Sequence, residues 1–324
     1  MKQLAPRILR AAAAALVLTC ATAAQAWPDR LVKVIVPAPA GGNIDVLARI
    51  YADFLARETG QAVVIENKAG AGGGIGTQAM LAAPADGHTL MFTNSNVLAE
   101  VPHVLKPSFD PMKDVKAVAT VAQFRYMLVG SPELPANDLA GLAKHLKSLQ
   151  GKASFASPSP GTLAHFGGEL LNRRFDTDMK HVPFSGSPAA LVGVMSGQVT
   201  MYIDGVVTSG PLARAGKVKP FGIAGQTRFA QLPNVPTFKE QGYPELADFL
   251  NWMGVTVSHK VPASVTEQIY AATRKIASRS EFQAKLSDLG FEPVEPSSPE
   301  QFTRILQADY ARNAEFVRKM NIKP

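Results

Sequence analysis

The sequence predicts an α/β protein made of two lobes and a helical tail. Short apolar runs alternate with segments of helical periodicity from residue 31 to residue 93, and the same alternation resumes after residue 125. The last third of the chain then changes to helical segments alone. Alternating strands and helices are typical of parallel sheets covered by helices. With 324 residues, the chain is long enough for two such units, since a domain commonly holds about 100–200 residues.

The first 26 residues have the pattern of an export signal. Three cations are followed by an alanine-rich apolar stretch over 11–24 and by the triplet Ala24-Gln25-Ala26, which fits the small-x-small cleavage pattern. The apolar stretch is shorter than the roughly 20 residues that a membrane-spanning helix needs. We therefore predict a signal peptide over 1–26, cleaved after Ala26, and an exported product over 27–324.

Cys20 is the single cysteine of the chain and lies inside this leader. Lipid attachment is the alternative to a free exported product, but Thr19 stands where a lipoprotein signal normally has a small residue. A product that begins at Trp27 would contain no thiol. Disulfides, zinc–thiolate sites and cysteine nucleophiles are then all excluded.

The charge pattern argues against nucleic-acid partners. The net charge of +7 includes the three cations of the leader, and no run of Lys and Arg is longer than two residues. Nucleic-acid binding needs basic residues clustered on one face or along one helix. The dispersed charges here favour an ordinary solvated surface.

The first predicted lobe begins with a buried strand over 32–38. A helix over 44–59 follows, with its apolar residues on one face and Gly60 at its end. Further predicted elements are a strand over 63–67, a glycine loop with a helix through Gln78 and Leu81, and a strand over 89–93. This order predicts a parallel sheet.

The second predicted lobe repeats this order. Its expected strands are 127–130, 153–156, 181–184, 199–203 and 220–224, and its expected helices are 139–149, 162–175 and 188–195. The run 118–129 is long enough to cross between lobes, and 252–257 is the natural return crossing. Lobe 1 would then comprise 27–125 plus 252–324, and lobe 2 would comprise 126–251. The tail helices, over 265–277, 281–289 and 300–319, would pack back on lobe 1.

The junction over 37–45 is the first candidate for ligand binding. Ala40, Gly41 and Gly42 stand between a strand and a long helix, where glycine lets the backbone approach a ligand closely. The positive end of the helix dipole favours an anion there. Asn43 or Asp45 as a helix cap, or a plain tight turn, is the alternative.

A second glycine loop spans 70–76. The glycine spacing does not fit a dinucleotide-binding fingerprint, and no Lys-Ser or Lys-Thr follows for a phosphate loop. We therefore interpret the loop as a backbone cradle near the cleft, with Gly73 as its candidate contact, and expect no nucleotide cofactor.

Three more junctions are rich in small and polar residues. They lie after the strands that end near residues 93, 156 and 184, and Ser187 is the expected cap of the helix after the last one. The carboxyl ends of strands in facing α/β lobes form one cleft. The candidate contacts from these junctions are Thr93, Asn94, Ser95, Ser157, Gly161, Thr162, Ser185 and Gly186.

Two titratable residues join the candidate site. His165 falls in the first turn of a predicted helix, and Asp204 ends a predicted strand, so both can face the cleft. A packed histidine and a turn-capping aspartate are the alternatives. The six histidines show no spacing typical of metal ligands, so no metal site is expected.

Catalytic motifs of serine and zinc hydrolases do not occur in the sequence. An exported hydrolase would have to use Ser157 or Ser95 with His165 as its base. We predict no catalytic residues and favour binding without chemistry, in which a ligand bridges the lobes and stabilises their closed arrangement.

Many ordered segments of this chain resemble one family. They include Val34-Ile35-Val36-Pro37 with the following glycines, Val63-Val64-Ile65-Glu66-Asn67, Asp86-Gly87-His88-Thr89-Leu90, His181-Val182-Pro183-Phe184 and Leu232-Pro233-Asn234-Val235-Pro236. On these segments the chain resembles the Bug-type solute receptors of tripartite tricarboxylate transport systems.

The resemblance implies a type II periplasmic binding-protein fold and a periplasmic location. It also implies a small carboxylate ligand held by backbone amides, hydroxyls and waters, no cofactor, and a monomer. The implied partner is a membrane transporter or, alternatively, a sensor ectodomain. Ala38 and Ala40 stand where the family usually has phenylalanine and proline, which widens one wall of the cleft and allows a bulkier acid.

Overall fold

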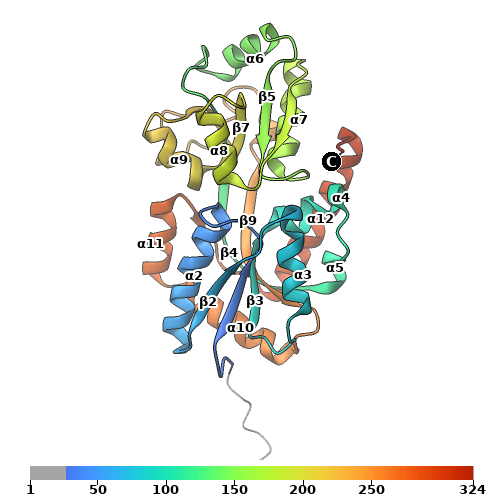
Figure 1. Cartoon of the computed structure of the whole chain (residues 1–324). Helices are drawn as coiled ribbons and strands as arrows, with labels where there is room; N and C mark the ends of the chain where they lie inside the picture. Colours follow the sequence, from blue (N-terminus) through green and yellow to red (C-terminus); the bar gives the residue numbers. More distant parts are fainter. Residues whose placement is uncertain (1–26, 324) are drawn as a thin grey trace, which may run out of the picture.

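The computed structural model describes residues 27–323. It has two α/β lobes, which lie one above the other in Figure 1, and two strands run between them. The signal-peptide prediction and Cys20 lie outside the described residues. The predicted two-lobe α/β fold is confirmed, while the exact lobe boundaries at 125/126 and 251/252 stay a prediction.

The sheet of lobe 1 begins with three parallel strands in the order β2-β1-β3. These are β1 (Val32–Val36), β2 (Val63–Asn67) and β3 (Thr89–Asn94). The first strand is two residues shorter than predicted, because Pro37 and Pro39 have no N–H to donate to the sheet. β9 (Leu250–Ser258) then pairs antiparallel with β3.

β4 (Val115–Gly130) is the strand that joins the lobes. Its first part pairs antiparallel with β9 in lobe 1, and residues 126–130 pair with β7 (Met201–Gly205) in lobe 2. The predicted crossing over 118–129 lies within this strand. A single rigid strand shared by both sheets fixes where the two lobes face each other.

Three strands of the lobe 2 sheet are parallel to one another, as predicted. β5 (Ser154–Ser157) lies between β6 (Lys180–Pro183) and β7, and β8 (Lys219–Ile223) pairs antiparallel with β4. This arrangement, in which every antiparallel pairing of the described strands involves β4 or β9, was not expected. It follows from their connections, since the chain enters and leaves lobe 2 along neighbouring strands.

Helices cover both sheets. Those of lobe 1 are α2 (Asn43–Thr59), α3 (Gly74–Ala82), α10 (Ala263–Ala277), α11 (Ser280–Leu289) and α12 (Pro299–Met320). Those of lobe 2 are α6 (Leu139–Ser148), α7 (Leu163–Phe175), α8 (Ser187–Met195) and α9 (Val206–Arg214). The tail packs on lobe 1, as expected, but α12 is long enough for its end to reach α7 of lobe 2 (Figure 1).

Shorter helical turns connect these elements. They are η1 (Ala71–Gly73), the π-helical turn η2 (Asn96–Glu100), α4 (Pro102–Leu105), α5 (Pro111–Asp114) and η3 (Pro244–Leu246). The tail also contains a two-residue strand, β10 (Glu292–Pro293), paired with β4. This strand was not predicted, because a two-residue bridge has no periodicity.

Candidate ligand-binding site

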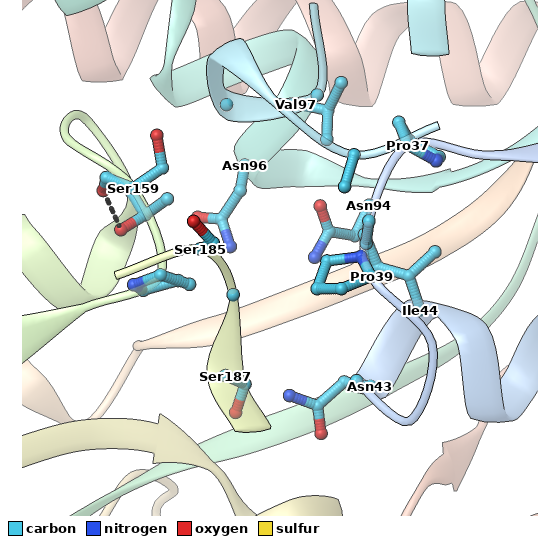
Figure 2. Close-up of a pocket in the computed structure, with 18 of the residues that line it drawn as sticks. Pro37, Pro39, Asn43, Ile44, Asn94, Asn96, Val97, Ser159, Ser185 and Ser187 are labelled. Carbon is cyan, nitrogen blue, oxygen red and sulfur yellow. Dashed lines mark hydrogen bonds between the residues drawn. The ribbon is translucent and has the colours of Figure 1, made fainter. Parts of the chain in front are cut away.

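A cavity of about 350 Å³ lies between the lobes. Its lining comes from loops at the carboxyl ends of β1, β2 and β3 in lobe 1 and of β5, β6 and β7 in lobe 2. Phe124 and Tyr126 of β4 also line it. Figure 2 shows Asn43 facing Ser187 from the opposite lobe, with Asn94 and Asn96 above them.

Four helices begin at this cavity. The residues just before α2, α3, α7 and α8 are Gly42, Gly73, Thr162 and Gly186, and all four line the cavity. None of the four caps its own helix with a side chain, whereas α6 and α12, which begin elsewhere, have such caps. α7 is capped from the other lobe by Asn96, whose Oδ1 accepts from the Leu163 N–H. The N-termini of α2, α3 and α8 have no side-chain cap and present partial positive charge, so together they favour an anion.

Asp204 is the single charged side chain of the described cavity lining, which contains no Lys, Arg or His. It is 1% exposed, and burial raises its pKa to about 6. Its carboxylate accepts hydrogen bonds from the hydroxyls of Ser187 and Thr208, the latter at 2.5 Å. Ser187 is therefore not the cap predicted for α8; Gly186 holds the cap position, and the hydroxyl of Ser187 is used by Asp204.

The lobes contact each other around the cavity. The N–H of Leu163 in lobe 2 donates to Asn96 Oδ1 in lobe 1 at 3.0 Å, and the hydroxyl of Thr208 lies 3.2 Å from Asn43 Oδ1. Gly186 has φ +99°, and a Cβ there would lie 2.3 Å from Pro39 Cγ across the interface. The two lobes are therefore arranged with little space between these loops.

Half of the predicted contacts line the cavity. These are Gly42, Gly73, Asn94, Thr162, Ser185, Gly186 and Asp204. They come from five different junctions and the end of β7, so the structure brings together segments that lie up to 162 residues apart (Gly42 and Asp204). Their contact with a ligand stays a prediction.

Four of the predicted contacts in lobe 1 lie outside the cavity lining. Ala40 and Gly41 are exposed outside the cavity, and the Gly41 N–H donates to Asp45 Oδ2 at 2.8 Å. Thr93 and Ser95 are buried away from it. Successive residues of a strand face opposite sides, so Asn94 reaches the cavity while Thr93 does not, and Ser95 instead donates to Glu100 at 2.9 Å.

Three of the predicted contacts in lobe 2 also lie outside the cavity lining. The Ser157 hydroxyl is fully buried and lies 2.7 Å from His181 Nε2, not beside His165. Gly161 has φ +82° and packs against Val104. His165 stacks on His181 with ring centroids 3.8 Å apart, in a second hollow on lobe 2. The Ser157–His165 pair that a hydrolase would need is therefore not formed.

Several cavity residues escaped the sequence analysis. They are chiefly Pro39, Asn43, Asn96, Phe124, Tyr126 and Phe184. A usable signal existed for two of them, because Phe124 and Tyr126 stand two residues apart on the strand predicted to cross between lobes, and so face the same side. No such signal existed for Asn96, since nothing in the local sequence marks the π-helical turn in which it lies.

Among residues 27–323, no group of three or more His, Cys, Asp and Glu side chains is arranged to hold a metal ion. Within the same range no helix is both long enough and apolar enough to cross a membrane.

Two facing α/β lobes with a cavity at the carboxyl ends of their strands define a solute-binding protein of the periplasmic type. More particularly, the chain belongs to the tripartite tricarboxylate transporter family receptors, whose family profile matches residues 47–322. Protein BugT of Bordetella pertussis is 35% identical over 224 residues, which are 68% of this chain and 69% of BugT. The resemblance to Bug-type receptors is thereby confirmed.

Two solved structures extend the comparison. A protein of R. palustris, solved with adipate, is 27% identical with a TM-score of 0.87, covering 92% of this chain and 99% of that chain. MatC from Rhodopseudomonas palustris, solved with bound malate, is 30% identical with a TM-score of 0.83, covering 90% of this chain and 100% of that chain. The family and these neighbours are solute-binding proteins.

Proposed function

We propose that this chain is a periplasmic receptor that binds a small carboxylate between its lobes and delivers it to a tripartite tricarboxylate-type membrane transporter. The observation that carries the proposal is the convergence of four helix N-termini, three of them without a side-chain cap, on one interlobe cavity without a basic side chain. Backbone N–H groups would then hold the carboxylate. The adipate-bound and malate-bound relatives support the same ligand class.

Binding would work by closing the lobes. α2 and α3 belong to lobe 1, while α7 and α8 belong to lobe 2, so an anion between them contacts both halves. A ligand that contacts both lobes at once binds the closed arrangement more tightly than the open one and shifts the population toward it. No bond has to be made or broken in this process.

A thermal-shift screen tests the proposal. The purified protein is titrated with mono-, di- and tricarboxylates, aromatic acids, and neutral amides of the same acids as matched controls. An acid that binds the folded state alone, present at about 100 times its Kd, stabilises that state by about 2.7 kcal/mol. We expect the unfolding midpoint to rise for one class of acids and not for their amides. Equal shifts with acids and amides, or none after refolding removes any copurified ligand, would refute carboxylate binding.

Export and delivery need separate experiments. We expect N-terminal sequencing of the product from the periplasm to begin at Trp27, in agreement with the cleavage pattern at Ala26. Uptake of the labelled acid should need both this receptor and the transporter. Binding without any effect on uptake would instead indicate a sensory role.

A further inference from the structure

The Asp204 end of the cavity presents hydrogen-bond acceptors. Both oxygens of Asp204 accept hydrogen bonds from hydroxyls, so Ser187 and Thr208 each donate their single O–H to this carboxylate. Of the two, Ser187 lines the cavity, and what its side chain still offers to a ligand is lone pairs. Asp204 lies at the end of β7, next to the first residue of α8 in space. The protein's own carboxylate therefore lies close to this helix end.

Asn94 adds a second acceptor, on the lobe 1 side. Its side chain is 4% exposed, lines the cavity, and points toward Asn96 and Ser185 in Figure 2. Within the described part of the chain, no group donates a hydrogen bond to its Oδ1 atom. A buried carbonyl oxygen without a donor is costly, so a donor on the ligand is the partner that fits it.

The charge of the lining limits how many carboxylates can enter. A monocarboxylate can use the N-terminus of α3, behind Gly73 in lobe 1, which has no side-chain cap. A second carboxylate would have to approach Asp204, and the described lining has no basic side chain to offset that repulsion. Like charges that meet in a poorly solvated cavity repel strongly.

We propose that the cavity selects a monocarboxylate that also carries a hydrogen-bond donor, namely a hydroxyl, amino or amide group, and that Asp204 is the residue that rejects di- and tricarboxylates. The inference rests on the proposed function and narrows it. It sets this chain apart from the relatives solved with adipate and malate, which are both dicarboxylates.

Two series of acids with matched skeletons test this specificity by calorimetric titration near neutral pH. One series is hexanoate, 6-hydroxyhexanoate, 6-aminohexanoate and adipate. The other is benzoate, 4-hydroxybenzoate, 4-aminobenzoate and terephthalate. In at least one series we expect the hydroxy or amino acid to bind about tenfold or more tightly than both the unsubstituted acid and the diacid, the effect of one buried hydrogen bond or one buried repulsion.

The variant Asp204→Asn keeps the shape of the side chain and removes its charge. We expect it to improve the affinity for the diacid relative to the hydroxy acid by about tenfold. Adipate or terephthalate binding to the wild type as tightly as the hydroxy acid would overturn the inference while leaving the carboxylate receptor intact. An unchanged preference in a folded Asp204→Asn protein would overturn the role of Asp204.

Two further results keep the test decisive. If Asp204→Asn does not fold, the wild-type preference within each series still decides for or against the proposed selection. If neither series nor the wider acid screen gives any binding, the proposed function fails together with this inference. That result is distinct from diacid binding, which would contradict the specificity alone.

Discussion

Asn96 Oδ1 accepts a hydrogen bond from the N–H of Leu163, at 3.0 Å, across the space between the two lobes. Leu163 is the first residue of α7, and Thr162 before it does not cap the helix with its own side chain. A residue of lobe 1 thus caps a helix of lobe 2. The same amide group donates from Nδ2 to the Tyr126 hydroxyl at 2.8 Å, which holds it in place on β4.

Replacing Asn96 should therefore weaken the closed arrangement. We expect Asn96→Ala to lose about 1 kcal/mol of capping energy from the closed state and to raise the Kd for the ligand by about fivefold. Calorimetric titration and the radius of gyration from X-ray scattering measure the two effects. Tyr126→Phe is a companion variant: it removes a cavity-lining hydroxyl that orients Asn96 but leaves the cap itself, so it should weaken binding less than Asn96→Ala. An Asn96→Ala protein with unchanged affinity and unchanged size distribution would contradict the capping role.

A methyl group at Gly186 should also oppose closure. Gly186 and Gly197 both have positive φ, +99° and +74°, but a Cβ at Gly197 would meet nothing within 4 Å. Gly197→Ala should therefore lose about 1 kcal/mol of stability from backbone strain. Gly186→Ala should lose more, about 1–3 kcal/mol, because Gly186 has ψ 171° and so lies in a region that is essentially reserved for glycine. Only Gly186→Ala places a methyl group against Pro39 of the other lobe, so it alone should weaken ligand binding. Equal affinities of the two variants would show that the lobes do not close on this contact.

A charge introduced at position 42 tests whether the ligand group bound at the N-terminus of α2 is an anion. A Cβ at Gly42 would make only ordinary contacts, 3.5 Å to the Pro39 carbonyl oxygen and 3.9 Å to Pro188 Cδ. Asp and Asn both favour this helix-cap position, so both variants should fold. We expect Gly42→Asp to weaken binding of the acid by more than about tenfold, through repulsion, and Gly42→Asn by less than about threefold. Similar Kd values for the two variants would place the carboxylate away from α2.

The sequence was sufficient to predict the two-lobe fold because its elements are locally encoded. β1, β2 and β3 have apolar runs, and α2 has an apolar face closed by Gly60, which adopts the left-handed conformation typical of a helix end. The glycine and serine junctions correctly indicated which ends of the strands face the cavity.

The individual contacts were harder to predict, because they depend on the facing lobe. β3 is buried on both sides, so its sequence does not show that Asn94 faces the cavity and Thr93 the core. His165 lies in the expected turn of α7 but stacks on His181, a residue of β6. Asn96 reaches its partner only because a π-helical turn and α7 meet between lobes. Such relationships are set by tertiary packing alone.

The stacked pair of His165 and His181 should make the protein sensitive to acid. Burial, with the neighbouring His181, lowers the pKa of His165 to about 3, and burial lowers that of His181 to about 4. The folded protein then binds fewer protons than the unfolded chain below pH 6.5, so stability is complete above that value and falls as the pH drops toward 4. The slope should approach about 1 kcal/mol per pH unit for each histidine.

Urea unfolding between about pH 7.5 and pH 4.5 measures this slope. His165→Phe keeps an aromatic ring beside Phe155 and His181 and removes one titrating group, so its stability should fall less with acid than that of the wild type. His259→Gln, at an exposed position, should follow the wild type. Identical slopes for His165→Phe and wild type would show that the pair does not govern acid sensitivity.

Glu100 should make the folded protein less stable as the pH rises, the opposite of the effect of the histidine pair. It is 1% exposed, its Oε1 atom accepts from Ser95 at 2.9 Å, and burial raises its pKa to about 8. The folded state therefore holds a proton that the unfolded chain releases above pH 4.5, so stability decreases as the pH rises from 4.5 to 8. Glu100→Gln stays neutral at every pH, and we expect it to be more stable than the wild type near pH 8.5, with the difference shrinking by about 1 kcal/mol per pH unit on acidification. Glu267→Gln, at an exposed position, is the control. A constant difference between Glu100→Gln and wild type across this range would mean that Glu100 stays ionised in the folded protein.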